Sequence, residues 1–241
     1  EYRRQRQMCI RDRYNIQHTV TPVNGKLQVK LECERPDVEI RYTMDGKEPT
    51  DRSLLYKSPL MVTGTQTIKC TTYRAGRQMG KTLTLPLVWN KATAKPVLGN
   101  TQAGKILVNG IRGSLRQSDF EWHSWESSDS VAFTIDLQKK ESLRSVSVGC
   151  ITNYGMAAHK PADIEVWVSN DNRDYRKVSG KQFTDGEIFR EGTFKEDVVL
   201  DLNKEIGRYV RIIAKGAGEC PATHVRPGQE ARIYFDEVMI E

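Results

Sequence analysis

Aromatic, histidine and amide side chains gather in the long polar stretches of the second half of the chain, residues 109–129, 151–161 and 216–231. Carbohydrate recognition commonly pairs an aromatic ring, on which the C–H face of a sugar stacks, with Asn, Arg, His or acidic groups that bind the hydroxyls. These stretches carry both kinds of side chain, so we expect carbohydrate binding there. The candidate residues are Trp125, Asn153, Tyr154, His159 and His224.

The cysteines suggest no metal or disulfide framework. They are widely spaced and form no CxxC pair, which is the spacing of neither a zinc site nor a small disulfide-rich scaffold. Cys33, Cys70 and Cys150 lie within alternating apolar patterns, where a thiol packs as a small hydrophobic group. The sequence leaves a Cys33–Cys70 disulfide open. The five cysteines are Cys9, Cys33, Cys70, Cys150 and Cys220.

Strands must position the candidate residues, because the dominant apolar period from about Val20 onward is two. Turn residues such as Asn24-Gly25 and Asp45-Gly46 separate the alternating segments. Many short strands at this spacing predict an all-β chain, with a jelly-roll-like β-sandwich in its second half. The expected strands are 27–33, 38–44, 67–73, 82–89, 130–137, 143–150, 162–169, 197–202, 208–215 and 232–240.

The stretch 90–105 contains Pro96, Gly99 and Gly104 among small and polar residues, and is the clearest domain boundary. We predict one module over residues 16–92 and a second over residues 98–241. Residues 1–15 show neither alternation nor a turn leading into a strand, so we interpret them as a linker or non-native tail outside both modules.

The formal charge of +6 does not indicate a nucleic-acid partner. Five arginines fall in residues 1–15, and basic and acidic residues are interspersed over the rest of the chain. A nucleic-acid binder concentrates its basic residues on one element or motif. No apolar run approaches the ~18 residues that a membrane-spanning helix needs. We therefore expect neither nucleic acid nor a membrane span.

The segment IRYTMDGKEPTDRSLLYKSPLMVTGTQTIKCTTYRAG, residues 40–76, resembles the chitobiase/β-hexosaminidase C-terminal domain. That family has an immunoglobulin-like or fibronectin-like β-sandwich fold. The resemblance implies a structural spacer, in which Tyr56 and Pro59 pack the returning edge of the sheet.

The second module resembles the discoidin, or coagulation factor 5/8 type C, domain, which overlaps with family 32 carbohydrate-binding modules. The resemblance implies a discoidin-like jelly-roll β-sandwich, in which Trp122 corresponds to a packing residue. The matching segments include LVNGIRGS (107–114), KPADIEVWVSNDNRDYRKV (160–178), RYVRIIAK (208–215) and FDEVMIE (235–241).

More narrowly, GIRGS, VSVGCITNYG and ECPATHVRPGQEARIYFDEV are similar to the C-terminal tail of Bacteroidetes β-N-acetylhexosaminidases of glycoside hydrolase family 20. α-L-Fucosidases are a second parent enzyme with similar tails. The chain departs from the hexosaminidase pattern in GMAAHKP (155–161) and EARIYFDE (230–237), where two aromatic positions are Ala and Arg.

The discoidin resemblance also implies a Ca²⁺ site, since Ca²⁺ takes six to eight oxygen ligands from loop carbonyls and carboxylates. Carried over to this chain, the ligands are Asn109, the backbone of Arg112, Ser114 and Glu237, with Asp119 as a further candidate. Asn109 replaces the usual Asp and removes one negative charge.

Catalysis has little support in this sequence. Family 20 hydrolases use an adjacent Asp-Glu pair, and the only such pair here, Asp236-Glu237, lies on the last expected strand with no barrel before it. We therefore expect a non-catalytic accessory region, for carbohydrate binding or enzyme positioning, of a β-N-acetylhexosaminidase that is secreted, periplasmic or outer-membrane-associated. Its expected partners are glycans containing N-acetylhexosamine or galactose and its own upstream catalytic domain, and the alternative is a purely structural region.

Overall fold

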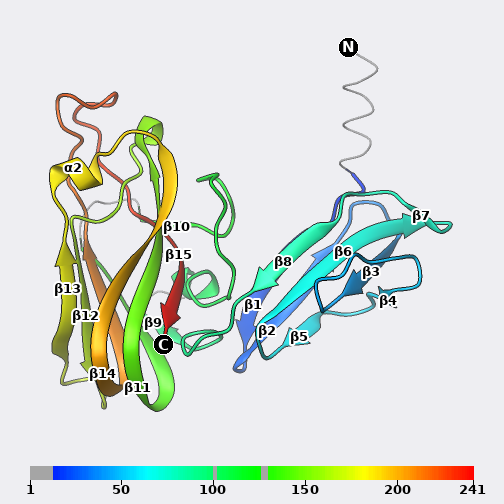
Figure 1. Cartoon of the computed structure of the whole chain (residues 1–241), viewed down its shortest axis with the longest axis horizontal. Helices are drawn as coiled ribbons and strands as arrows, with labels where there is room; N and C mark the ends of the chain where they lie inside the picture. The colour runs from blue at the N-terminus through cyan, green and yellow to red at the C-terminus, as the bar shows by residue number, and fades with distance from the viewer. Residues whose placement is uncertain (1–12, 100–101, 126–129) are drawn as a thin grey trace. The chain divides into compact units, whose positions relative to one another are not determined.

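The computed structural model describes residues 13–99, 102–125 and 130–241. The chain divides into two compact units, Glu1–Trp89 and Asn90–Glu241, which Figure 1 draws from blue to cyan and from green to red. Strands are the predominant regular element of both units, as the alternating sequence predicts. The all-β prediction is therefore confirmed.

The first unit is a sandwich of two antiparallel sheets, one of three strands in the order β1-β2-β5 and one built on β4-β3-β6-β7. Strand β8 joins the second sheet by pairing with β6. The strands are β1 Gln17–Val23, β2 Lys26–Glu32, β3 Glu39–Thr43, β4 Leu54–Leu55, β5 Leu60–Val62, β6 Gln66–Arg74, β7 Arg77–Gln78 and β8 Leu83–Leu87.

Alternating residues of these strands fill the core between the two sheets, and Leu27, Val29 and Ile68 are fully buried. Tyr56 ties the sheets together, because its hydroxyl accepts a hydrogen bond of 3.0 Å from the backbone N–H of Leu31 in β2. Its own backbone N–H donates to the carbonyl of Ile40 in β3. The tyrosine thus holds the returning edge, as the family resemblance implies.

The start of the first unit lies earlier than we predicted. Tyr14 is buried, its carbonyl accepts a hydrogen bond of 2.8 Å from the Thr72 hydroxyl, and Asn15 accepts one from Lys81. Residues 13–15 therefore belong to the sandwich, and the rest of the predicted tail lies outside the described residues. Cys33 and Cys70 are free thiols, so the disulfide that the sequence left open is not formed.

The second unit is one antiparallel sheet in the order β10-β15-β11-β14-β12-β13, with β9 paired to β11. Short helices lie in its loops. The elements are β9 Val97–Leu98, η1 Ala103–Lys105, β10 His123–Ser124, β11 Val131–Asn153, η2 Tyr154–Met156, β12 Asp163–Ser169, β13 Arg176–Gln182, α2 Asp185–Ile188, β14 Thr193–Lys215 and β15 Tyr234–Ile240.

Strands β11 and β14 each join two of the strands that we predicted separately. Their pairing shifts register between Asp136 and Glu141, close to the positive φ of Gln138. These breaks let the long hairpin bend over on itself. Its two halves then enclose one core that includes Phe133, Val148 and Ile212.

Residues 90–97, which we placed at the end of the first module and in the boundary before residue 98, pack into the second unit. Ala92 lies in the hydrophobic core, and Val97 and Leu98 form β9 against β11. The backbone N–H of Lys91 donates to the carbonyl of Ile240 on the last strand. The small and polar side chains of this segment therefore allow it to pack closely against the second unit, and they do not make it a flexible linker.

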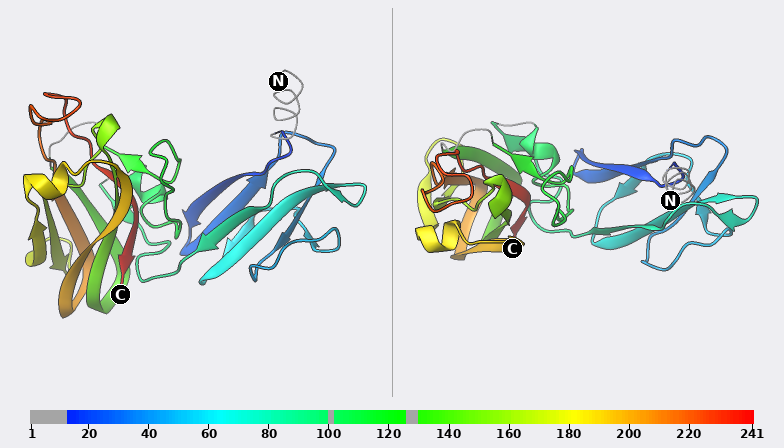
Figure 2. Two further views of the ribbon diagram at one scale, coloured as in Figure 1. Left: turned by 45° about the horizontal axis from the view of Figure 1, so that its top comes forward. Right: turned by 90° about the horizontal axis from the view of Figure 1, so that it is seen from above.

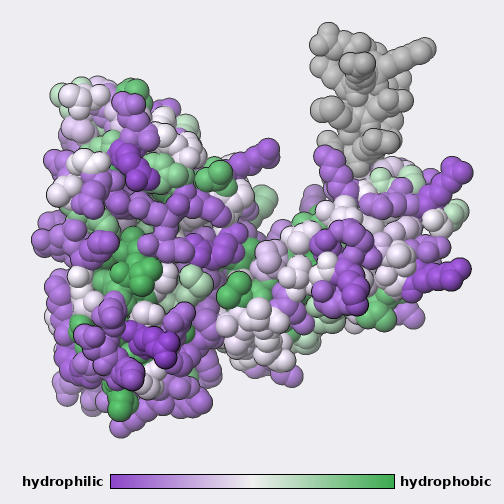
Figure 3. All heavy atoms as spheres, viewed as in Figure 1, coloured by the Kyte–Doolittle hydropathy of each residue, from purple (hydrophilic) through white to green (hydrophobic). Residues whose placement is uncertain are grey.

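Helix α2 and the loop 216–231 lie together at one end of the second unit, at the top of Figure 1 and also in the left view of Figure 2. On the face shown in Figure 3, hydrophilic residues cover most of the surface. None of the helices in the described part of the chain has the length and apolar character that a membrane-spanning helix requires.

Candidate functional site

Trp125 is partly buried, and its ring packs against the hydrophobic core. Its ring stacks on Phe133 at a centroid distance of 6.3 Å and meets Phe235 edge-on at 5.3 Å. His123 packs edge-on against it, and burial lowers the pKa of that imidazole. Trp122 is also buried, with its indole N–H donating to the Ser114 carbonyl, so its implied packing role agrees with the structure.

His159 and His224 were expected to face a sugar, but both are buried and bonded to each other. Their exposed fractions are 1% and 4%, and their Nε2 atoms lie 3.2 Å apart. The Arg226 N–H donates to Nδ1 of His224, so Nε2 of His224 carries the proton and donates to Nε2 of His159. Nδ1–H of His159 then donates to the Ile188 carbonyl. Burial lowers the pKa of His159 to about 4.

Tyr154 packs over this pair and is only half-buried. Its ring centroid lies 3.9 Å from that of His224, and its hydroxyl donates to the Thr223 carbonyl at 3.5 Å. One face of the Tyr154 ring is therefore packed inside the protein. The two histidines and Tyr154 form a packed cluster beneath the loops, not a binding surface.

A pocket of about 520 Å³ opens at the same end of the unit, and it contains Asn153, the remaining predicted sugar-binding residue. Its walls mix apolar groups with amides and a guanidinium. Leu115 and Met156 expose more than half of their side chains, at 57% and 51%. The lining residues are Leu115, Arg116, Gln117, Ser118, Asn153, Met156, Thr193 and Tyr234.

One amide side chain of this pocket has an unused hydrogen-bond acceptor. Gln117 Oε1 is buried and accepts no hydrogen bond from the described residues. A buried acceptor without a partner destabilises the protein, because it has lost its hydrogen bonds to water. A ligand hydroxyl that donates to this acceptor would restore a hydrogen bond and so favour binding. Sequence reasoning missed Gln117 and Tyr234, since neither lies in an aromatic cluster. Phe120, 93% exposed, was also missed.

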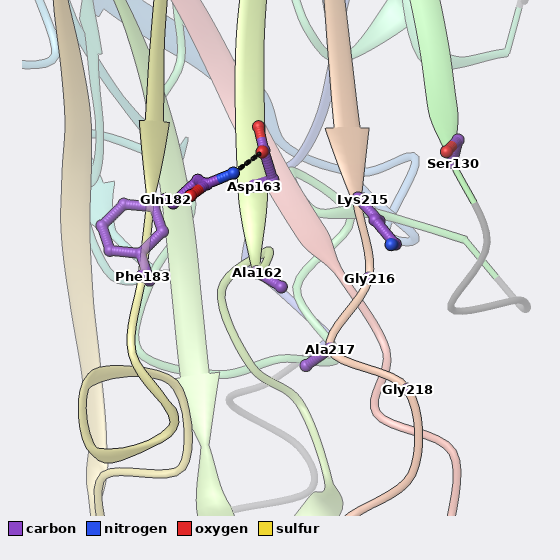
Figure 4. A pocket seen from close by; sticks show the side chains of 9 residues that line it. All are labelled: Ser130, Ala162, Asp163, Gln182, Phe183, Lys215, Gly216, Ala217 and Gly218. Atoms are coloured by element: carbon purple, nitrogen blue, oxygen red, sulfur yellow. Dashed lines mark hydrogen bonds between the residues drawn. The ribbon is translucent and has the colours of Figure 1, made fainter.

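A second pocket, of about 530 Å³, lies where β12, β13 and β14 meet. In Figure 4, Gln182 donates to Asp163 across its wall, at 3.0 Å, and backbone of residues 216–218 forms another side. Its aromatic residue, Phe183, has its ring engaged by Lys160 and Lys181, whose Nζ atoms lie 4.5 and 5.1 Å from the centroid. A sugar would have to displace these cations to stack there.

The Asp236-Glu237 pair serves structure rather than catalysis. Asp236 is fully buried and accepts hydrogen bonds from Arg112 Nε at 3.0 Å, the Gly113 N–H at 2.9 Å and the Glu237 N–H at 2.6 Å. Arg112 also pairs with Asp197. Burial alone would lower the pKa of Arg112, but the two carboxylates raise it above its usual value.

Three of the residues proposed for Ca²⁺, Glu237, Asn109 and Ser114, offer side-chain oxygens. Glu237 is fully buried, one carboxylate oxygen accepts from the Gly110 N–H at 3.0 Å, and the other accepts no hydrogen bond from the described residues. Burial raises the pKa of Glu237 well above its usual range. Asn109 Oδ1 and Ser114 Oγ each accept one backbone hydrogen bond, which leaves a lone pair on each. An orphaned buried carboxylate oxygen beside such donors fits a hard cation.

A family model described as the F5/8 type C domain matches residues 91–226, more than half of the chain. The chain belongs to the F5/8 type C domain family. A second model, the chitobiase/beta-hexosaminidase C-terminal domain, matches residues 21–84 of the first unit. Both are modules without catalytic machinery of their own, so this part of the F5/8 type C protein is non-catalytic. No curated protein matches the sequence.

Solved structures similar to this F5/8 type C chain share low sequence identity with it. The Clostridium perfringens module CpGH89CBM32-6 is 18% identical, covering 53% of this chain and 81% of its own, with a TM-score of 0.33. A Streptococcus pneumoniae fucose-binding module is 18% identical, covering 63% and 94%, with a TM-score of 0.37. The C-terminal domain of a Bacteroides fragilis chitobiase is 10% identical, covering 54% and 76%, with a TM-score of 0.33.

Proposed function

We propose that the second unit is a carbohydrate-binding module and that its glycan occupies the pocket between residues 115–118 and Tyr234. The observation that carries the proposal is the orphaned acceptor Gln117 Oε1 in the wall of this pocket. The amide of Asn153 and the guanidinium of Arg116 add donors at the same opening. Polar groups that converge in a pocket with apolar walls are typical of ligand sites.

The walls favour a sugar with one apolar face. Tyr234, Leu115 and Met156 offer ring and aliphatic surface to the C–H groups of a pyranose, while the amides bind its hydroxyl or acetamido groups. N-Acetylhexosamine and galactose both present such a face beside polar substituents. A glycan ending in one of these sugars is therefore the proposed ligand.

The parent protein that we propose is an exported glycoside hydrolase, either a β-N-acetylhexosaminidase or an α-L-fucosidase. The order of a chitobiase/β-hexosaminidase C-terminal domain and an F5/8 type C domain supports this assignment. In this arrangement the first unit is a spacer, and the second holds the enzyme near its substrate. The alternative is that the second unit only packs on the catalytic domain.

The decisive experiment is calorimetric titration of the chain with N-acetylglucosamine, N-acetylgalactosamine, galactose and their β-linked disaccharides. We expect Gln117→Ala and Asn153→Ala to weaken binding about 10-fold each, since each removes a hydrogen bond of about 1.4 kcal/mol. The matched control is Gln182→Ala in the second pocket, which leaves affinity unchanged. Absence of binding across the panel would favour the packing role.

We also propose that Glu237, Asn109, Ser114 and the Arg112 carbonyl hold Ca²⁺, which would neutralise the buried carboxylate and fix the loop 109–114. At 100 times its dissociation constant, Ca²⁺ would stabilise the folded state by about 2.7 kcal/mol. The test is a thermal shift with Ca²⁺, with Mg²⁺ as the control ion. Glu237→Gln should abolish the shift, and an equal shift in that variant would exclude this site.

A further inference from the structure

A third group of ligand-type side chains lies beneath the loops, outside the glycan pocket and the Ca²⁺ site. His159, Cys220 and His224 are all buried, and one ligand atom from each lies within 4.8 Å of the other two. We propose that these three residues bind a divalent cation of the Zn²⁺ class. Imidazole nitrogen and thiolate sulfur are the ligands that such ions prefer.

The backbone holds all three residues in place before any ion arrives. Cys220 lies in the neck of the loop 216–231, where its N–H donates to the Gln229 carbonyl and its carbonyl accepts from Gly228. The N–H of His224 donates to the Pro221 carbonyl, and this turn brings its ring back over the neck. His159 is fixed from the opposite side, because its N–H donates to the Arg232 carbonyl.

The tautomer of His159 already suits a metal ligand. Its Nδ1–H donates to the Ile188 carbonyl at 3.0 Å, so Nε2 presents a lone pair toward the cluster. Metal-binding histidines commonly donate their second ring N–H to a carbonyl or carboxylate, which fixes the ring and raises its basicity. The Ile188 carbonyl, next to the C-terminal end of α2, has this role here.

The distances require only a small contraction. Zn–N bonds of about 2.05 Å and Zn–S bonds of about 2.3 Å in a tetrahedron separate two nitrogens by about 3.3 Å and a nitrogen from sulfur by about 3.6 Å. The two Nε2 atoms are 3.2 Å apart, already at this separation. Sulfur lies within 4.8 Å of one ring nitrogen of each histidine, so it must approach by at most about 1 Å.

Binding also moves two protons. The thiol proton of Cys220 leaves for solvent as sulfur coordinates. The proton of His224 shifts from Nε2 to Nδ1, so the backbone N–H of Arg226 loses its acceptor and the turn 224–226 must adjust to separate the two donors. The net reaction is one cation bound and one proton released.

The burial of the cluster indicates a structural ion rather than a hydrolytic one. Phe189 and Tyr154 pack on the imidazoles, with centroids 5.0 Å from His159 and 3.9 Å from His224. The loop 216–231 contains no strand or helix, so a cation shared with His159 would fasten it to the loop 154–161. None of the three ligands lines the glycan pocket, so this inference stands apart from the proposed sugar binding.

The test is titration of the chelator-treated full chain with Co²⁺, followed by Zn²⁺ competition. We expect one Co²⁺ per chain, visible d–d bands of a four-coordinate ion whose fourth ligand is water, a near-ultraviolet thiolate-to-cobalt band and release of one proton. Cys220→Ser should remove the thiolate band. It should also weaken binding by more than the roughly 10- to 100-fold that loss of an outer-shell partner costs. Cys33→Ser, a half-buried thiol of the first unit, is the matched control.

The wild-type spectrum decides the question even if Cys220→Ser does not fold. Weak octahedral bands without thiolate charge transfer, or no uptake of Co²⁺ and Zn²⁺ at micromolar concentration, would overturn the proposal. The histidine pair would then be only a hydrogen-bonded element of the core. Zn²⁺ should also protect one thiol from alkylation, and unchanged alkylation of Cys220 would count equally against the site.

Discussion

Replacing Arg112 with Met tests the buried ionic network beneath the loop 109–114. The methionine keeps the aliphatic stem of Arg112 and removes the guanidinium that faces Asp236. Asp236 is fully buried and keeps two backbone donors, from Gly113 and Glu237. The substitution therefore leaves a buried carboxylate with hydrogen bonds but without its counter-charge.

Breaking a buried pair by removing one partner costs about 3–5 kcal/mol. The two remaining backbone donors place the expected loss at the lower end, about 3 kcal/mol, in the free energy of unfolding of the second unit. For a domain of this size, each kcal/mol lowers the melting temperature by about 2–4 °C. We therefore expect Arg112→Met to lower it by about 6–12 °C.

Thermal unfolding followed by tryptophan fluorescence reports mainly on the second unit, because three of the four tryptophans, Trp122, Trp125 and Trp167, lie in it. The control is Arg176→Met. Its ion pair with Glu205 is exposed, with side-chain exposures of 54% and 33%, and such pairs contribute about 0–1 kcal/mol. If both variants shifted the transition equally, the buried network would not stabilise the unit as argued here.

Three further substitutions follow from individual contacts. Gly149→Ala would place a Cβ 1.9 Å from Asp236 Oδ1, so we expect the free energy of unfolding, measured with urea, to fall by about 1–3 kcal/mol or more. The control is Gly186→Ala, which has open space around it and should lower the free energy of unfolding far less. Tyr56→Phe leaves the Leu31 N–H without its acceptor and should cost about 1–3 kcal/mol in the first unit; a variant as stable as wild type would show that the hydroxyl links nothing. Burial lowers the pKa of His123 below 6.5, so stability that is present above pH 6.5 is lost as pH falls through the folded pKa. His123→Phe should flatten this dependence, and an unchanged pH profile would contradict the assignment.

The period of the sequence determined the all-β fold, since an alternating pattern buries one face of a strand and cannot form an amphipathic helix. The period did not determine which predicted strands are parts of one continuous strand. The segments 130–137 and 143–150 read as separate strands because Gln138 to Lys140 are polar. A left-handed residue at Gln138 nevertheless continues the ladder through a register shift. Residues 90–97 were likewise misread, because small side chains suit both linkers and close packing.

The sequence also identified which residue types could bind ligands, but only the tertiary structure decided which of them face solvent. Trp125 and His159 have the chemistry of sugar recognition, yet Trp125 packs its ring against the core and His159 is buried. Gln117 and Tyr234 carry no local signal and meet only because β15 returns beside β11. His159 and Cys220 lie far apart in the chain, so no spacing rule brings them together. Burial and proximity are properties of the packed loops, and a one-dimensional pattern cannot encode them residue by residue.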